Sequence, residues 1–285
     1  MSPRQILTDL LVALADNEPG AVPWTDGARI TENNVPLPLG DGAWQTVSEI
    51  DRLDIWVETD RAASVVGILR EGAHWSPFIQ RIAVEGGRVA EAELVVIRAL
   101  DAAGAFHNAD LAPRPEFGRS VSPERRMSGD DMIALVDGYF ATLQQNDGTL
   151  HTRFHAECRR RENGVWTTQN TDPNVAPTMR MGCAASFELG FFRGNERVRG
   201  RRYPLVDEET GLVLAGAFID HSGRLKQYAL TNGTTMAAGF QRPHTYAMLE
   251  AFKMEAGEIT AIEAVFHPVP YRMQAAWPTL DDDGR

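Results

Sequence analysis

The sequence predicts an α+β fold in which one supersecondary unit occurs twice, and two internal similarities support this prediction. ARITENNV (28–35) and CRRRENGV (158–165) share Arg, Glu, Asn and Val at matching positions, 130 residues apart. AVEGGRVAEAELVV (83–96) recurs as KMEAGEITAIEAVF (253–266), 170 residues apart. The signatures keep the same order in both copies, which indicates a duplicated unit. A helical pattern precedes β-rich segments in each copy, as is typical of α+β domains.

The first copy is assigned to residues 1–110 and begins with an amphipathic helix over about residues 3–16. The apolar residues of this helix follow helical spacing: Ile6, Leu7, Leu10, Leu11 and Leu14. Gly86–Gly87 separates two β-rich runs, which predicts a hairpin. Short strands are expected over 29–32, 53–58, 64–69, 75–85 and 88–98.

The second copy is assigned to residues 130–276, after a linker at 111–129 that is rich in Pro, Gly, Ser and Arg. A helix is predicted over about 130–145. Strands are expected near 158–163, 201–207, 212–220, 246–254 and 258–267.

The offset between matching residues grows from 128 to 170 along the chain, so the second copy carries two insertions. They fall within 166–200 and 221–245. Long loops on compact domains often serve as lids or binding loops. A contact between subunits or sequence drift is the alternative, and the sequence leaves both open.

The composition of the chain indicates a globular protein and excludes several classes of partner. The chain has 285 residues, of which 43% are hydrophobic and 24% charged, as in globular domains. Its net charge of −11 argues against a nucleic-acid partner. Asp9 and Asp16 interrupt the N-terminal apolar stretch, and no run is long enough to span a membrane. The two cysteines, Cys158 and Cys183, cannot form a disulfide framework. We therefore expect a cytoplasmic protein without a membrane or nucleic-acid partner.

Three segments carry a resemblance to a known fold family: RRENG (160–164), RRYPLVDEETGLV (201–213) and EAFKMEAGEITAIEAVFHPVPY (250–271). They resemble a tandem-domain branch of the nuclear-transport-factor-2-like group, which includes the SnoaL-like cyclases and the ketosteroid isomerases. The resemblance implies two tandem cystatin-like α+β barrels, each a curved antiparallel sheet wrapped on helices around a conical cavity. It also implies a homodimer paired through the outer face of the sheet. Members of the group range from enzymes to binding modules, so the fold does not choose a function.

Several polar residues of the second copy stand where the first copy is apolar. Tyr139 corresponds to Leu11, and His267 corresponds to Ile97. A buried polar group needs a partner, so each residue either closes the core with a hydrogen bond or serves an acid–base site. In ketosteroid isomerases a donor lies on the opening helix and a carboxylate follows the helices. By order along the chain, Tyr139 and Glu157 fall at similar places, and His267 falls near a late-strand position where many relatives carry aspartate.

Other candidates come from strand parity and from the strand ends. Arg201 and Tyr203 share one strand face, and we expect them to point inward. Arg81, Arg98 and His107 could line a second cavity in the first copy, although a plain loop position is the alternative for His107.

The sequence also contains one possible metal-binding pattern and one set of residues that both copies share. His151 and His155 are four residues apart with Glu157 near, which on a helix could bind zinc. That segment is expected to enter a strand, so a histidine that acts as a base or donor is preferred, and no metal is predicted. Glu32–Asn33 and Glu162–Asn163 occur in both copies and are interpreted as structural.

The chain contains none of the sequence motifs of nucleotide, flavin or serine-hydrolase chemistry, so we expect a reaction without a cofactor. Within the resemblance, the branch is similar to the sphingomonad diarylpropane γ-formaldehyde lyases. These convert lignin-derived 1,2-diarylpropane-1,3-diols into stilbenes through a quinone methide. The resemblance therefore implies a small aromatic substrate. The alternatives are an isomerase or dehydratase of a steroid-like substrate and a non-catalytic binding module.

The candidate residues fall into two sets. The predicted catalytic residues are His107, His155, Tyr203, His267 and Arg201. The predicted substrate-binding residues are Tyr139, Glu157, Arg81 and Arg98.

Overall fold

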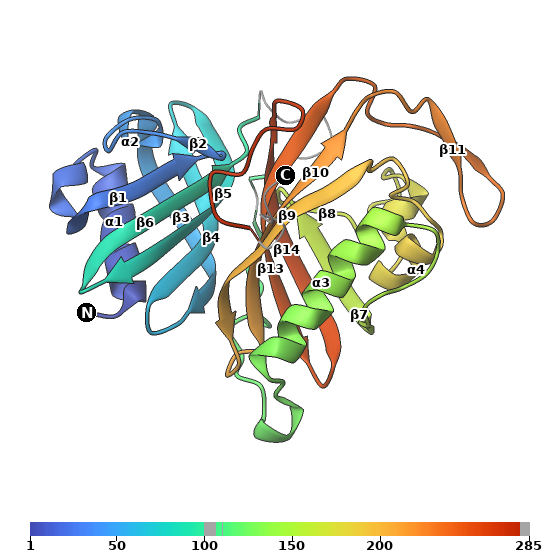
Figure 1. The fold of residues 1–285 in the computed structure, drawn as a ribbon, viewed down its shortest axis with the longest axis horizontal. Coiled ribbons are helices and arrows are strands. Elements are labelled where there is room, and N and C mark those ends of the chain that lie inside the picture. Colours follow the sequence, from blue (N-terminus) through green and yellow to red (C-terminus); the bar gives the residue numbers. More distant parts are fainter. Residues whose placement is uncertain (100–106, 110, 280–285) are drawn as a thin grey trace.

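A computed structural model describes residues 1–99, 107–109 and 111–279. Two domains stand side by side, each with a helix laid across one face of a curved six-stranded sheet (Figure 1). This confirms the predicted α+β class and the two tandem cystatin-like domains. The sheets were expected to be antiparallel, but each is mixed, because its first long strand pairs in parallel with its last strand. Residue 110, where the first domain is predicted to end, lies outside the described residues.

The first domain begins with helix α1 (Pro3–Ala15), which starts where the sequence supplies a cap. The Ser2 side chain accepts a hydrogen bond from the Gln5 backbone N–H, and Pro3 occupies the first turn. Its apolar face is buried against the sheet. The other elements are β1 (Trp24–Glu32), β2 (Val35–Pro36), α2 (Ala43–Thr46), β3 (Val47–Glu58), β4 (Ala62–Glu71), β5 (His74–Glu85) and β6 (Arg88–Val96), in sheet order β2-β1-β6-β5-β4-β3.

The second domain repeats this plan with helix α3 (Gly129–Gln145), whose N-terminus is capped by the Ser128 side chain. The following elements are β7 (Phe154–Glu162), β8 (Val165–Trp166), α4 (Cys183–Glu188), β9 (Arg197–Asp207), β10 (Leu212–His221), β11 (Gln227–Ala229), β12 (Thr235–Ala237), β13 (His244–Glu255) and β14 (Glu258–Val269). The sheet order β8-β7-β14-β13-β10-β9 matches that of the first domain strand for strand.

Strand register shows that the two copies correspond residue by residue. Ile30 pairs with Ala92, and Arg160 pairs with Ile262, which reproduces both sequence offsets. The shared asparagine has one role in both copies. The Asn33 side chain accepts from the Val96 backbone N–H, and the Asn163 side chain accepts from that of Phe266, each at 2.9 Å. These side chains fasten the end of the last long strand.

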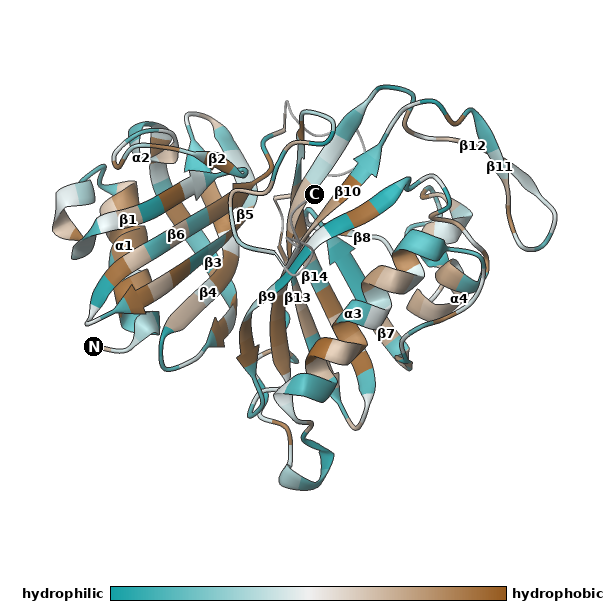
Figure 2. Cartoon of the chain, viewed as in Figure 1, coloured by the Kyte–Doolittle hydropathy of each residue, from teal (hydrophilic) through white to brown (hydrophobic). Residues whose placement is uncertain are grey.

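The domains differ where the second copy is longer. In the first domain β4 turns directly into β5, whereas in the second the hairpin β11–β12 intervenes between β10 and β13. The hairpin extends beyond the second sheet (Figure 1). Residues 167–196 hold a 3-10 turn, Pro177–Arg180, and helix α4. Figure 2 shows the hairpin as mainly hydrophilic or neutral, in contrast to the hydrophobic central strands.

The outer faces of the two sheets pack against each other, so the helices lie on opposite flanks of the molecule (Figure 1). The shared apolar cluster includes Ile55 and Val66 from the first sheet, Leu214 and Leu249 from the second, and Phe117 from the linker. The face through which a homodimer was expected to pair is thus covered within the chain. None of the described helices is long and apolar enough to cross a membrane.

Candidate functional site

The interior of the second domain holds a hydrogen-bonded tyrosine and glutamate. Tyr139 lies on the inward face of α3, and Glu250 lies on β13, where it alternates with the core residues Met248 and Phe252. Both side chains are buried. The Tyr139 hydroxyl donates to Glu250 Oε1 at 3.1 Å. Helical and strand periodicity thus bring two polar groups together inside an apolar core.

Aromatic rings surround this pair. The Tyr139 ring makes edge contacts with four phenylalanines at centroid distances of 5.0–6.3 Å: Phe140, Phe154, Phe187 and Phe252. Such a wall excludes water and strengthens electrostatic interactions within it.

Strand β7 adds a buried cation, Arg160. Its Nε donates to Thr167 Oγ1 at 3.1 Å and lies 3.5 Å from Glu162 Oε2. Burial alone lowers the pKa of Arg160, but the Glu162 carboxylate reverses the direction, so the guanidinium stays charged. The ring of Phe192 covers it at 4.7 Å.

The electrostatic balance keeps Glu250 protonated at neutral pH. Burial, reinforced by the charge of Glu162, raises the pKa of Glu250 to about 8, against the opposing effects of Arg160 and of the hydrogen bond from Tyr139. Burial and the neighbouring Glu250 raise the pKa of Tyr139 well above its usual value. The carboxyl group is therefore a proton carrier near neutrality, and the phenol remains a hydrogen-bond donor.

Two buried polar atoms of this cluster are left unsatisfied by the described residues. Glu250 Oε2 and Arg160 Nη1 are buried and have no hydrogen-bond partner among the described residues. Buried polar atoms in folded proteins nearly always have a partner, so unpaired ones mark a place where a ligand group would be stabilised.

A cavity of about 730 Å³ opens beside the cluster, where β10 ends and β13 begins. Phe192 lines it and its ring also covers Arg160, whereas Tyr139, Arg160 and Glu250 do not themselves line the cavity. Both insertions form its walls. Tyr228 of β11 donates to the Phe191 carbonyl at 2.6 Å, and Arg193 donates to the Ala229 carbonyl at 2.6 Å, which fastens the hairpin over the cavity.

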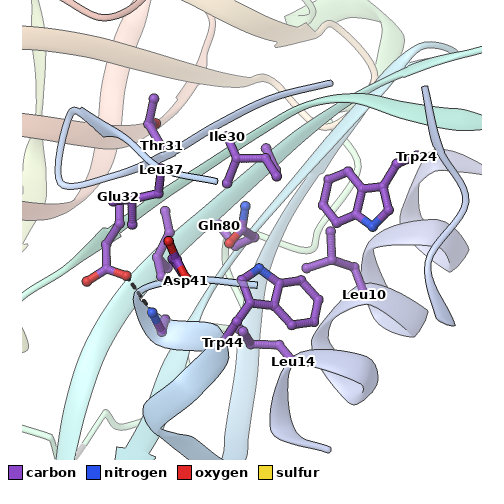
Figure 3. Close-up of a pocket in the computed structure, with 13 residues that line it drawn as sticks. Leu10, Leu14, Trp24, Ile30, Thr31, Glu32, Leu37, Asp41, Trp44 and Gln80 are labelled. Carbon is purple, nitrogen blue, oxygen red and sulfur yellow. Dashed lines mark hydrogen bonds between the residues drawn. The ribbon is translucent and has the colours of Figure 1, made fainter. Parts of the chain in front are cut away.

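The first domain lacks this chemistry. At the positions of Tyr139, Arg160 and Glu250 it carries Leu11, Ile30 and Gln80. Leu10, Trp24 and Trp44 fill its interior and leave a void of only about 20 Å³ (Figure 3). The Gln80 side chain donates to two backbone carbonyls, those of Arg81 and Glu93. Among the described residues, the arrangement of Tyr139, Arg160 and Glu250 therefore has no counterpart in the first domain.

Of the nine residues predicted from the sequence, Tyr139 lies in this cluster. Arg201 and Tyr203 share one face of β9, as strand parity predicted, and both contact Asp137 Oδ1 on α3, at 3.0 and 2.8 Å. They connect the sheet edge to the helix.

His155 and Glu157 come together on the outer face of β7. They line a separate cavity of about 490 Å³ that also includes Lys253. His267 lies on β14, next to Phe266, whose ring faces the interior, so His267 faces outward. His151 Nε2 forms a hydrogen bond of 3.0 Å with Gln145 Oε1. Within the described residues no cluster of three potential metal ligands occurs.

The three candidates of the first domain lie in different surroundings. Arg81 is buried and forms ion pairs with Glu93 and Glu91. Arg98 is held by Glu71 and Glu32. His107 lies beside the backbone of Trp75, and burial lowers its pKa.

Glu250 and Arg160 were not among the site residues predicted from the sequence. The sequence signal for Glu250 was present, since it is the only charged residue in the inward-facing alternation of β13: Tyr246, Met248, Glu250, Phe252 and Met254. Arg160 is one of three consecutive arginines, and only the strand register shows which of them points inward.

Comparison with known proteins supports no assignment of activity. Residues 125–266 match a family model described as a domain of unknown function (DUF8021). No curated protein sequence matches the chain.

Similar solved structures include three from bacteria. An NTF2-like protein of unknown function from Cytophaga hutchinsonii is 7% identical, with a TM-score of 0.30, over 34% of this chain and 91% of that one. Another from Burkholderia pseudomallei is 16% identical, with a TM-score of 0.28, over 33% and 90%. A hypothetical protein with a ketosteroid isomerase-like fold from Catenulispora acidiphila, in complex with trimethylamine, is 10% identical, with a TM-score of 0.29, over 40% and 100%.

Proposed function

We propose that the second domain is an acid–base catalyst for a small, largely apolar substrate, with Glu250 as the proton carrier. The observation that carries this proposal is the hydrogen bond between the buried Glu250 carboxyl group and Tyr139 in an aromatic enclosure, where burial raises the pKa of Glu250 to about 8. A group that titrates near the working pH is best suited to general acid–base catalysis, and perturbed carboxyl groups concentrate at functional sites.

Glu250, Tyr139 and Arg160 have separate roles in the proposed reaction. Protonated Glu250 gives its proton to a leaving or accepting oxygen of the substrate. The carboxylate that remains accepts the hydrogen bond of Tyr139, and the cationic Arg160 stabilises negative charge that develops nearby. The phenylalanine wall keeps water from these groups.

The specific reaction that we propose is the one implied by the resemblance, cleavage of a 1,2-diarylpropane-1,3-diol. With the para-hydroxyl of the adjacent ring bound as a phenolate by Arg160, Glu250 protonates the benzylic hydroxyl, which leaves as water while the phenolate becomes a quinone methide. The resulting carboxylate takes the proton of the γ-hydroxyl, the carbon–carbon bond breaks, and its electron pair returns the quinone methide to a phenolate. The products are a stilbene and formaldehyde, and Glu250 is again protonated. Support comes from the aromatic walls of the 730 Å³ cavity and from Arg160 beside the donor, where it can bind a phenolate.

Isomerisation of a steroid-like ketone is the second candidate, because a paired tyrosine and carboxyl group in a dry interior also suits proton transfer beside a carbonyl group. The two candidates predict different products from the same residues.

The test supplies purified full-length protein, without added metal or cofactor, with a diarylpropanediol or with an unconjugated steroid enone. Formaldehyde and stilbene together indicate the lyase, and a conjugated enone indicates the isomerase. Glu250→Gln should reduce turnover by about 10²–10⁴-fold, while Gln80→Met at the equivalent position of the first domain should leave it unchanged. Full activity of Glu250→Gln, or no conversion of either compound by folded protein, would contradict the catalytic proposal.

A further inference from the structure

Two histidines stack beside the large cavity in the second domain, and one of them, His221, lines it. His221 ends β10, His244 begins β13, and they are register partners. Their rings stack at 4.8 Å with an interplanar angle of 22°. Phe240 and Tyr246 enclose the pair, with centroid distances to His221 of 4.5 and 5.5 Å.

The hydrogen bonds of these histidines determine which nitrogen carries the proton. Nδ1 of His221 lies 3.3 Å from the Gly194 carbonyl, and Nδ1 of His244 lies 2.9 Å from the Arg242 carbonyl. A carbonyl oxygen only accepts, so each Nδ1 holds the hydrogen, and each Nε2 of a neutral ring is an acceptor. His244 Nε2 is buried and has no hydrogen-bond partner among the described residues.

The surroundings favour a neutral ligand group over an ion. Burial, followed by the neighbouring His244, lowers the pKa of His221 to about 4, so this ring is uncharged at neutral pH. The nearby Asp220 accepts hydrogen bonds from Arg199 and Thr245, and the Arg193 guanidinium donates to backbone carbonyls. The uncharged His221, stacked on His244 within aromatic rings, therefore fits a hydroxyl donor on a flat, apolar molecule.

We propose that His221 and His244 form a recognition subsite that accepts a hydrogen bond from a hydroxyl group on an aromatic ring of the ligand. The subsite selects an uncharged hydroxylated ring over the same ring with a methoxy or carboxylate group. This inference rests on the proposed function in that the ligand is the substrate of the same domain. One part of the ligand binds at the histidines, and the remainder occupies the cavity that Phe192 lines.

Calorimetric binding of three probes at pH 7 tests the subsite independently of turnover: 2-naphthol, 2-methoxynaphthalene and 2-naphthoate. We expect the full-length protein to bind 2-naphthol about tenfold more tightly than 2-methoxynaphthalene, and naphthoate more weakly than naphthol. His244→Phe keeps a ring in the stack but removes the acceptor, so it should abolish the preference while 2-methoxynaphthalene still binds. His221→Phe should reduce the preference.

The control variant is Glu250→Gln, which should keep the naphthol preference and lose turnover. Equal binding of naphthol and methoxynaphthalene by the unaltered protein would overturn the subsite, as would tighter binding of naphthoate. The same conclusion follows if His244→Phe retains the preference. A preserved preference without turnover of any tested substrate leaves the subsite standing and removes the catalytic proposal. Turnover without the preference removes the subsite and leaves the catalytic proposal standing.

Discussion

Glu250 and Gln80 occupy equivalent positions and differ by a single group of the side chain, a carboxyl against an amide. The carboxyl group can release a proton, whereas the amide cannot. Gln80 donates to two backbone carbonyls and closes its own core. Glu250 instead retains one buried oxygen without a hydrogen-bond partner among the described residues. The chemical difference between the two domains therefore begins with individual side chains on a shared backbone plan.

The raised pKa of Glu250 predicts a pH dependence of stability. Folding raises this pKa from 4.5 to about 8, so the folded protein binds the proton more tightly than the unfolded chain. The resulting stabilisation is fully present below pH 4.5 and is lost as the pH rises to about 8. It is on the order of a few kcal/mol, since each pKa unit corresponds to about 1.4 kcal/mol.

Urea unfolding of the unaltered protein and of Glu250→Gln between pH 5 and 8.5 measures this contribution. The glutamine keeps an acceptor for Tyr139 but does not titrate. Relative to the unaltered protein, the variant should gain stability steadily as the pH rises. A stability difference that stays constant over this range would show that Glu250 does not titrate there.

At the level of secondary structure, helix α3 packs closely against the backbone of His151, at the residue next to Tyr139. A Cβ atom added at Gly138 would overlap the backbone carbonyl of His151. Glycine therefore permits the close approach that positions the inward face of the helix over β13.

Gly138→Ala should displace α3 and lengthen the hydrogen bond between Tyr139 and Glu250. We expect a loss of about 1–3 kcal/mol in the free energy of unfolding, together with reduced turnover. The control is Gly27→Ala in β1, where an added Cβ has no neighbour within 4 Å. Similar unfolding free energies for the two variants, measured in urea, would contradict the close-contact argument.

The elements were largely predictable, because periodicity and turn residues are local signals. Both opening helices and the paired last strands of each copy follow apolar spacing and Gly-containing turns. The hairpin β11–β12 was not predicted from the sequence, because its two three-residue strands are too short to show alternation. Its place over the cavity depends on contacts such as that between Tyr228 and Phe191, which lie far apart in sequence.

The whole molecule is organised by the contact between the outer faces of its two sheets. Glu93 of the first domain forms an ion pair with Arg202 of the second and also with Arg81. All three side chains are largely shielded from water at this interface. Removal of one partner from a buried ion pair leaves an uncompensated charge, which is costly.

Glu93→Gln should therefore lower the free energy of unfolding by about 3–5 kcal/mol. Glu91→Gln provides the control, because Glu91 also pairs with Arg81 but is 37% exposed. Its loss should cost no more than about 1 kcal/mol. Equal effects of both substitutions in urea unfolding would indicate that the Glu93 network adds little to the interface.

The sequence by itself determined the duplication, the order of the elements and the positions of the two insertions, because repeats and periodicity are written in local residue patterns. It also indicated Tyr139 as a polar residue on an apolar helix face. Only the tertiary structure decided that Tyr139 meets Glu250, 111 residues later, and that both insertions enclose one cavity. Such pairings depend on strand register and on sheet curvature over the full domain, which no local window contains.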